Sequence, residues 1–286
     1  MTAALSSAPP RRILLAIDLR SRSDRASDRA VQLAAQWQAA LHVVHVLPQA
    51  DDGWPMAPLA TCDGPTPSAA VPAERQLRRD FGETAVVHVV EGDPATAILA
   101  VAVEQQCELI VLGASDAPPA GRLGRVAEAL LRRSPASLLV VKQRARAAYG
   151  KLLVGTDFTA ESRHGLLAAA EWFPAARLAL LHVLDIPYRS LWLDAGHGEE
   201  LARMEHATMQ AFVAATPLDG RRLAKTWVEH GHPEFVLRDC ALEQEMDLVV
   251  ISAFRRGLAF HLLVGGTARR VVPAAPCDVL LVRAPS

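Results

Sequence analysis

The sequence predicts an α/β protein made of two consecutive domains with the same fold, each a five-stranded parallel sheet with helices on both faces. Two observations lead to this prediction. A set of landmarks occurs twice in the same order, and short runs rich in Val, Leu and Ile alternate with amphipathic segments of helical length. The length of 286 residues is enough for two domains that each bury a core of their own.

The repeat starts with an apolar run that ends on a carboxylate. The run RILLAI before Asp18 returns as KLLVGT before Asp157, 139 positions later. The next runs, LHVVHVL and LALLHVL, contain His45 and His182. The remaining landmarks are 91–94 with 230–233, 109–113 with 248–252, and 137–141 with 278–282. Because the order is kept and the spacing changes by only a few residues, we interpret the two halves as a duplication.

The short apolar runs are hydrophobic on both faces, which is typical of buried parallel strands. Strands are expected at 12–17, 41–47, 85–90, 109–113 and 137–142, and again at 151–156, 178–184, 223–229, 247–252 and 278–283. Helices are expected between them, including 27–37, 94–105, 160–172 and 233–245. Pro94 and Pro233 suit the first turn of a helix, where the backbone amide needs no partner within the helix.

The halves differ between their second and third strands. The second half has a helix-like stretch at 199–214, whereas the first has a proline-rich stretch at 48–72. Its composition predicts an irregular loop, followed by a short helix near 74–81.

We expect domains at 1–143 and 150–286, with a short linker at 144–149 that lets them pack closely. They are expected to superpose about an approximate two-fold axis as two separate sheets rather than as one continuous sheet of ten strands.

Composition limits the possible partners and location. The formal net charge is −1, and no apolar run approaches the roughly 20 residues needed to cross a bilayer. We therefore expect neither nucleic acid nor a membrane as a partner. The four cysteines lie far apart and form no CxxC pair, which favours free thiols in a reducing compartment. Without a signal-peptide pattern at the start of the chain, a cytoplasmic location is expected.

Histidines raise the question of a metal site. His42 and His45 are three apart on a strand, and therefore on opposite faces. His45 and His182 are equivalent in the repeat, so packing or a structural hydrogen bond is the expected role. His230 and His232 can share one face, but a third ligand is missing. No metal is expected.

Two segments carry a family resemblance. The segment from Asp18 to Ala26 (DLRSRSDRA) and the stretch 256–282 (RGLAFHLLVGGTARRVVPAAPCDVLLV) resemble the first strand-to-helix junction and the last loop, helix and strand of the universal stress protein family. The similarity covers essentially the whole chain, twice. It implies Rossmann-like domains of the adenine nucleotide alpha hydrolase type, paired within the chain through their fifth strands as single-domain relatives pair in dimers. A homodimer of whole chains is a further possibility.

The resemblance also implies ATP as the ligand to consider. The family signature after the fourth strand is glycine, two residues, glycine, nine residues, then glycine with serine or threonine, and an aspartate after the first strand lies near the nucleotide. In the first copy these positions fall on Asp18, Gly113 and Gly124. Asp116 replaces the second glycine, the arm is shortened to seven residues, and Arg125 stands where Ser or Thr is expected.

In the second copy the nine-residue arm is kept. The residues implied near a nucleotide are Asp157, Val183, Ser252, Arg255, Gly265, Gly266 and Thr267. Ser252 and Arg255 replace the two leading glycines, so neither copy has an intact signature. If either pocket binds ATP, the second is expected to do so. For Asp18 and Asp157, capping of the following helix stays open beside a ligand role.

No catalytic residue is expected, because the chain has no G-x-S-x-G elbow, no Walker loop and no H-E-x-x-H. Two hypotheses remain. The first is a non-catalytic interaction or scaffold module of the stress response, with degenerate nucleotide-binding loops and unknown protein partners. The alternative is a stress sensor that binds ATP in its second domain.

Overall fold

The computed structural model describes residues 8–19, 24–47, 69–114, 123–185, 195–218, 223–253 and 266–284. The elements of the first half, in chain order, are β1 (Arg12–Ile17), α1 (Asp24–Trp37), β2 (Ala40–Leu47), α2 (Ala70–Phe81), the 3-10 turn η2 (Gly82–Thr84), β3 (Ala85–Glu91), α3 (Pro94–Glu104), β4 (Leu109–Gly113), α4 (Arg125–Arg133) and β5 (Ser137–Val141). Those of the second half are β6 (Lys151–Thr156), α5 (Ala160–Trp172), β7 (Arg177–Leu184), α7 (Ala195–Ala214), β8 (Lys225–His230), α8 (Pro233–Glu243), β9 (Leu248–Ala253), α9 (Gly266–Ala274) and β10 (Asp278–Arg283).

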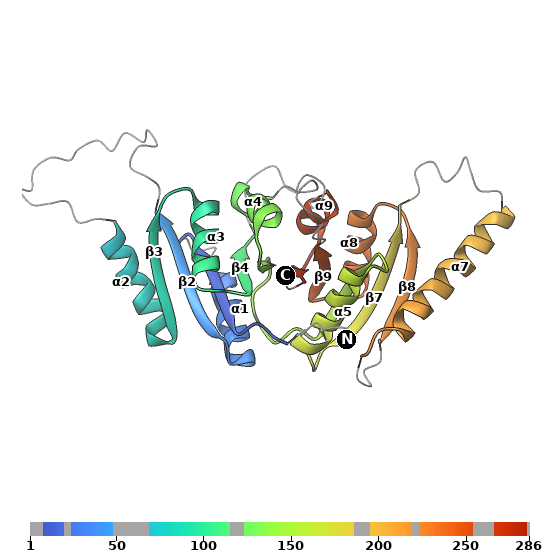
Figure 1. Cartoon of the computed structure of the whole chain (residues 1–286), viewed down its shortest axis with the longest axis horizontal. Coiled ribbons are helices and arrows are strands. Elements are labelled where there is room, and N and C mark those ends of the chain that lie inside the picture. The colour runs from blue at the N-terminus through green and yellow to red at the C-terminus, as the bar shows by residue number, and fades with distance from the viewer. Residues whose placement is uncertain are drawn as a thin grey trace, which may run out of the picture.

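The strands form one sheet in the order β3-β2-β1-β4-β5-β10-β9-β6-β7-β8 (Figure 1). Within each half all pairs are parallel, and the two halves have the same strand order. They meet where β5 pairs antiparallel with β10, with Leu139 opposite Leu280. The fifth strands thus pair as the family resemblance implies.

The expectation of two separate sheets is wrong, because the ten strands are continuous. The physical reason lies in the fifth strands. If the two sheets ended there, β5 and β10 would each expose a row of unpaired N–H and C=O groups at the interface between the domains. Pairing them with each other satisfies these groups and joins the sheets.

The core lies on both faces of this sheet. Alternate residues of each strand point to opposite faces, as Leu14 and Leu15 of β1 do. One face packs against α1, α2, α5 and α7 and the other against α3, α4, α8 and α9 (Figure 1). The predicted layers of an α/β protein are therefore confirmed.

The predicted strands differ from the observed ones by at most two residues at either end, but several helices are longer than expected. Helix α2 begins at Ala70 rather than near 74, so the irregular stretch predicted for 48–72 is wrong for residues 70–72. Pro72 lies in the first turn of this helix, where proline is tolerated. Residues 48–68 of that stretch lie outside the described residues.

Candidate functional site

The strand order reverses direction twice, between β1 and β4 and between β6 and β9. In open α/β sheets, ligands bind beyond the carboxyl ends of the strands at such a reversal. Asp18 follows β1 and Gly113 ends β4, so the fold brings these two predicted residues to the same edge. Asp157 and Ser252 have the equivalent places in the second half. The topology thus brings the predicted residues of each half to one edge of the sheet.

Each aspartate is followed by a residue in a left-handed backbone conformation. The φ angle is 57° at Leu19 and 62° at Phe158. Such a conformation is unfavourable for bulky side chains, costing about 1–3 kcal/mol, and has to be held by its surroundings. Phe158 shows how: its ring stacks on His182 with centroids 4.1 Å apart and also packs against Phe212. The turn therefore sends Phe158 inward, while both aspartates are exposed.

The carboxylate of Asp157 is part of this turn. Its Oδ1 accepts hydrogen bonds from the amide of Thr159, at 3.2 Å, and from the Thr159 hydroxyl, at 2.5 Å. Thr159 in turn is the N-cap of α5 and accepts from the amide of Ser162. In the second copy the helix cap is therefore Thr159 and not Asp157, whose carboxylate instead accepts hydrogen bonds from the capping residue.

A second chain of hydrogen bonds holds the same turn on its buried side. The Thr156 hydroxyl accepts from the amide of Phe158, at 3.0 Å, and lies 2.9 Å from the Ser162 hydroxyl. Thr156 and Ser162 are both buried. The side chains of the junction itself thus hold the strand-to-helix turn of the second half.

Ser252 does not face the open end of the site. A Cβ built on Gly165 of α5 would lie 2.0 Å from the Ser252 hydroxyl, so this hydroxyl points at the helix. It is buried and has no hydrogen-bond partner among the residues that the structure describes. In the first half the equivalent residues are Ala26 on the helix and Gly113 on the strand. The first copy thus has its glycine on the strand and the second copy has it on the helix. In the second copy, Ser252 fills the space that Gly165 leaves.

Of the other predicted residues in the second copy, Gly266 and Thr267 form the exposed start of α9. A Cβ on Gly266 would meet no atom of the described residues within 4 Å. Val183 is half-buried and packs on the opposite face of the sheet from its neighbour His182. Arg255 and Gly265 lie outside the described residues. In the first copy Gly124 precedes α4 as its N-cap, in an extended conformation.

The equivalent histidines make the structural hydrogen bonds predicted for them. His45 Nδ1 lies 2.9 Å from the carbonyl of Ile17, and His182 Nδ1 lies 2.8 Å from that of Thr156. Each bond joins the first and second strands of its half just before the candidate site.

One histidine pair was missed by the sequence analysis. His42 and His88 lie face to face on β2 and β3, with His42 Nδ1 3.1 Å from His88 Nε2. Burial lowers the pKa of both, and the neighbouring His88 lowers that of His42 further. The register between β2 and β3, which brings them together, has no signal in the sequence.

His230 and His232 contact separate carboxylates rather than a common centre. His230 Nε2 lies 3.2 Å from Glu205 and His232 Nδ1 lies 3.5 Å from Asp185. Within the described ranges no cluster of three or more His, Cys, Asp or Glu side chains is suited to hold a metal ion.

The cysteines that the structure describes are free, as predicted. Burial raises the pKa of Cys107 and Cys240 to about 11 and that of Cys277 to about 12. At neutral pH these thiols are protonated, which suits packing rather than chemistry.

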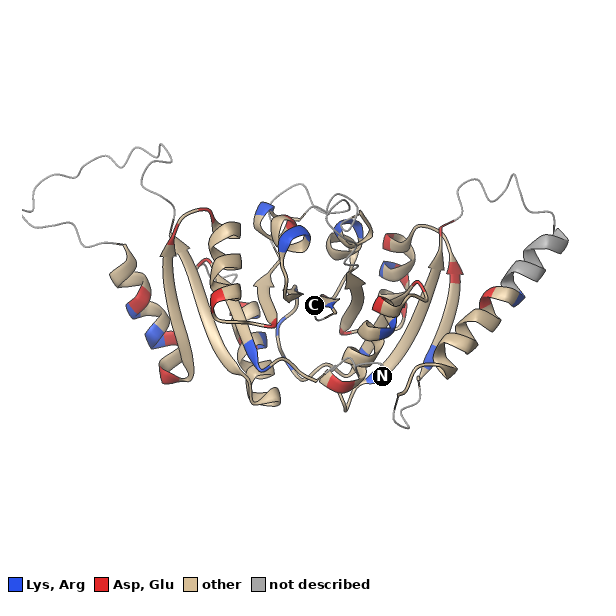
Figure 2. Ribbon diagram, viewed as in Figure 1, with Lys and Arg blue, Asp and Glu red and all other residues tan. Residues whose placement is uncertain are grey.

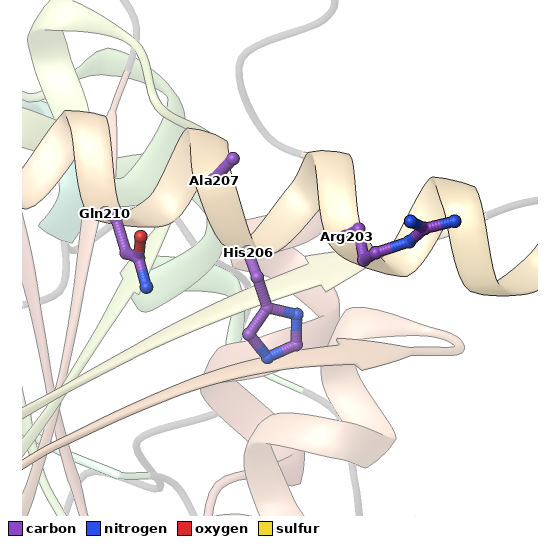
Figure 3. A pocket seen from close by; sticks show the side chains of 4 residues that line it. All are labelled: Arg203, His206, Ala207 and Gln210. Atoms are coloured by element: carbon purple, nitrogen blue, oxygen red, sulfur yellow. The ribbon is translucent and has the colours of Figure 1, made fainter.

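A shallow hollow lies elsewhere, on the outer face of α7. It is lined by Arg203, His206, Ala207 and Gln210, all from that one helix (Figure 3). Acidic and basic residues are interspersed over the helices of both halves (Figure 2). None of the helices, as far as the structure describes them, is long and apolar enough to span a membrane.

Comparisons with known proteins agree with the repeat and the topology. A family model described as the universal stress protein family matches residues 10–142 and again 148–283. A functionally unknown protein from Pseudomonas aeruginosa PAO1 has a similar structure, with a TM-score of 0.69 and 22% sequence identity over 96% of this chain and 93% of its own. A universal stress protein from Archaeoglobus fulgidus has a TM-score of 0.66 and 17% identity, over 98% of each chain.

A search of curated proteins found no match. The two matches of the family model together cover most of the chain, in the same order as the internal repeat. The chain therefore belongs to the universal stress protein family, as a member with two such domains in tandem.

Proposed function

We propose that the protein acts in the stress response as a non-catalytic interaction module whose nucleotide-binding loops are degenerate. The observation that carries this proposal is the junction after β6. There Asp157 holds the turn, Phe158 stacks on His182, and Ser252 packs against Gly165. These side chains serve the fold at positions where the family's nucleotide ligands would be expected. Domain limits at 1–143 and 150–286, with a linker at 144–149, are part of the same proposal.

The loop sequences support it on electrostatic grounds. In the first copy Asp116, which lies outside the described residues, stands in the sequence at the signature's second glycine, and a carboxylate there would repel a phosphate as any two like charges do, by about 1 kcal/mol at about 4 Å even in water. The second copy replaces both leading glycines, which removes the backbone freedom that lets amides close around phosphate oxygens. With weakened anion sites, contact with other proteins is the function that we propose for this two-domain body.

The alternative, an ATP-binding sensor in the second domain, keeps one specific observation in its favour. Gly266 and Thr267 stand exposed at the start of α9, and no atom of the described residues would meet a Cβ on Gly266 within 4 Å. A helix N-terminus of this kind favours anions because its first amides lack partners. Asp157 is exposed on the neighbouring strand end and would lie near the nucleoside.

Calorimetric titration of ATP with Mg²⁺ into the full chain tests both. The proposal predicts no saturable binding. The sensor alternative predicts binding that is weakened in Asp157→Asn and unchanged in Asp18→Asn. Asparagine is the matched choice because its side-chain oxygen can still accept the Thr159 hydrogen bonds while the charge is lost. Binding that depends on Asp18 alone would contradict the preference for the second pocket.

A further inference from the structure

We propose that the inner edges of the two domains are specific for each other, so that the first domain pairs with the second domain of its own chain and not with a like domain of another copy. The inner edges are β5 with α4 and β10 with α9. Their backbone contacts follow an approximate two-fold axis. The amide of Lys142 donates to Asp278 Oδ1 at 2.7 Å, and the amide of Arg283 donates to Ser137 Oγ at 3.1 Å. Ser137 and Asp278 are equivalent positions, each the first residue of a fifth strand.

The long basic side chains follow the same axis. Lys142 Nζ donates to the Val272 carbonyl at 2.5 Å, near the end of α9, and also to that of Ala275. Arg283 Nη2 donates to the Leu131 carbonyl at 2.5 Å, near the end of α4. Both satisfy carbonyls that lack partners in the last turn of a helix. A pair of like domains could make these contacts as well, so they hold the edges together without choosing between partners.

The choice comes from charges that break the symmetry. Glu128 of α4 and Arg269 of α9 are equivalent positions, 141 apart, and they form an ion pair across the axis. Two first domains would place Glu128 against its own copy, and two second domains would do the same with Arg269. The ion pair is partly exposed, with 30% of the Glu128 side chain and 48% of the Arg269 side chain accessible. Attraction in one arrangement and repulsion in the other two favour the observed pairing.

A buried charge adds to this preference. Asp278 is fully buried, and its Oδ2 lies 3.6 Å from Nε of Arg29, a buried residue of α1 in the first domain. The equivalent of Arg29 in the second domain is Ala168. Two second domains would therefore bury Asp278 without this guanidinium, and two first domains would leave Arg29 facing Ser137. Removing one partner of a buried ion pair is strongly destabilising, because the other charge stays buried.

The linker joins the same cluster. Arg29 Nη1 donates to the carbonyl of Ala147 at 2.9 Å, and its guanidinium lies 3.9 Å above the Tyr149 ring. The Tyr149 hydroxyl donates to Asp278 Oδ2 at 2.6 Å. The covalent link keeps the two edges at high effective concentration, and the charges make the wrong pairings unfavourable. Assembly of whole chains, if it occurs, would then use surfaces other than the inner edges.

Charge variants of the intact chain can reproduce, at the Glu128–Arg269 pair, the contacts expected between two first domains or between two second domains. Glu128→Arg sets arginine against Arg269, Arg269→Glu sets glutamate against Glu128, and the double swap restores opposite charges. Hydrogen exchange of the β5 and β10 backbone amides at low salt reports opening between the domains. We expect each single variant to raise the opening constant by roughly 5-fold, and the double swap to return within about 2-fold of the original. Added salt should reduce the differences.

The control is an ion pair within one domain that does not cross between the two inner edges. Arg270 and Glu234 lie 3.1 Å apart on α9 and α8, both in the second domain. Charge reversal there should leave the exchange of β5 unchanged. Two results would contradict the proposal for the exposed pair. In the first, the Glu128 and Arg269 single variants leave the opening constant unchanged. In the second, the increase in the opening constant of the double variant equals the product of the increases in the two single variants.

The buried pair is tested in the same way. Asp278→Ser reproduces a pair of first domains, and Arg29→Ala reproduces a pair of second domains. Each is expected to raise the opening constant by roughly 100-fold or more. The double variant, Asp278→Ser with Arg29→Ala, should have a smaller opening constant than Arg29→Ala alone. Arg29→Lys keeps the charge and serves as the milder variant, with an effect smaller than that of Arg29→Ala. If the increase in the opening constant of the double variant equals the product of the increases in the single variants, the buried pair does not select the domain partner.

Discussion

The contact between Gly165 and Ser252 allows a quantitative test of whether the Ser252 hydroxyl fills the space beside the helix glycine. In Gly165→Ala the new methyl group would lie 2.0 Å from the Ser252 hydroxyl, well inside any normal contact, so the hydroxyl has to leave its position or the strand and helix have to separate. Overpacking of this kind costs about 1–3 kcal/mol. Alanine gains about 1 kcal/mol in helix propensity over glycine, which offsets part of the cost. We expect a net loss of about 1 kcal/mol.

Ser252→Gly should remove that cost. The substitution deletes a buried hydroxyl that has no hydrogen-bond partner, which is favourable, and adds a flexible residue to a strand, which costs about 0.5–1 kcal/mol. In the double variant the helix keeps the propensity gain and the clash is absent. Gly165→Ala should therefore stabilise the Ser252→Gly background by about 1 kcal/mol, although it destabilises the original chain. The predicted coupling between the two positions is about 2 kcal/mol.

Urea unfolding monitored by tryptophan fluorescence provides the assay, because Trp172 ends the same helix and is buried. The mirror-image control is in the first half, where Gly113→Ser should be tolerated only together with Ala26→Gly. Additive effects, with a coupling below about 0.5 kcal/mol, would refute the reasoning. The Ser252 hydroxyl would then have rotated away from the helix, and a role toward a ligand would be open again.

Three further predictions follow from described contacts. Thr159→Ala should lower the free energy of unfolding by about 1 kcal/mol through loss of the α5 cap, measured by urea unfolding; an unchanged midpoint would contradict the capping assignment. The lowered pKa values of His42 and His88 mean that the unfolded chain takes up protons first, so stability should be full above about pH 6.5 and fall as the pH drops below it. His88→Gln should weaken that fall in unfolding measured between pH 7 and 5, and an identical profile would rule the pair out as its cause. Tyr149→Phe should cost about 1.5–3 kcal/mol by leaving Asp278 Oδ2 without its hydroxyl donor, and thermal unfolding of the variant at unchanged Tm would contradict this.

The strands could be predicted closely from the sequence because buried parallel strands are continuous apolar runs bounded by polar turns. The 109–113 and 151–156 predictions coincide with β4 and β6 for this reason. The start of α2 could not be predicted as well. Pro72 reads as a helix breaker in the sequence, yet the first turn of a helix accepts it.

The candidate site was predicted only in part. Asp18 and Asp157 follow their strands as expected, since the end of a strand is visible in the sequence. The direction of the Ser252 hydroxyl was not predictable, because it depends on a glycine 87 positions away on a helix that packs against the strand end. The family signature covers only positions in and around the loop after the fourth strand. It therefore gives no sign that a serine in place of the strand glycine can be accommodated by a glycine on the helix that packs against it.

The nucleotide content of the freshly purified full chain distinguishes the interaction module from the ATP sensor. Denaturing the protein and examining the released small molecules by mass spectrometry, together with the absorbance ratio of the native sample, measures how much adenine nucleotide each chain carries. If the protein is an interaction module, we expect no adenine nucleotide at a stoichiometric level, and none retained after incubation with ATP and removal of the excess. Close to one nucleotide per chain would contradict the interaction-module proposal and establish the second domain's pocket, or the first, as a working nucleotide site.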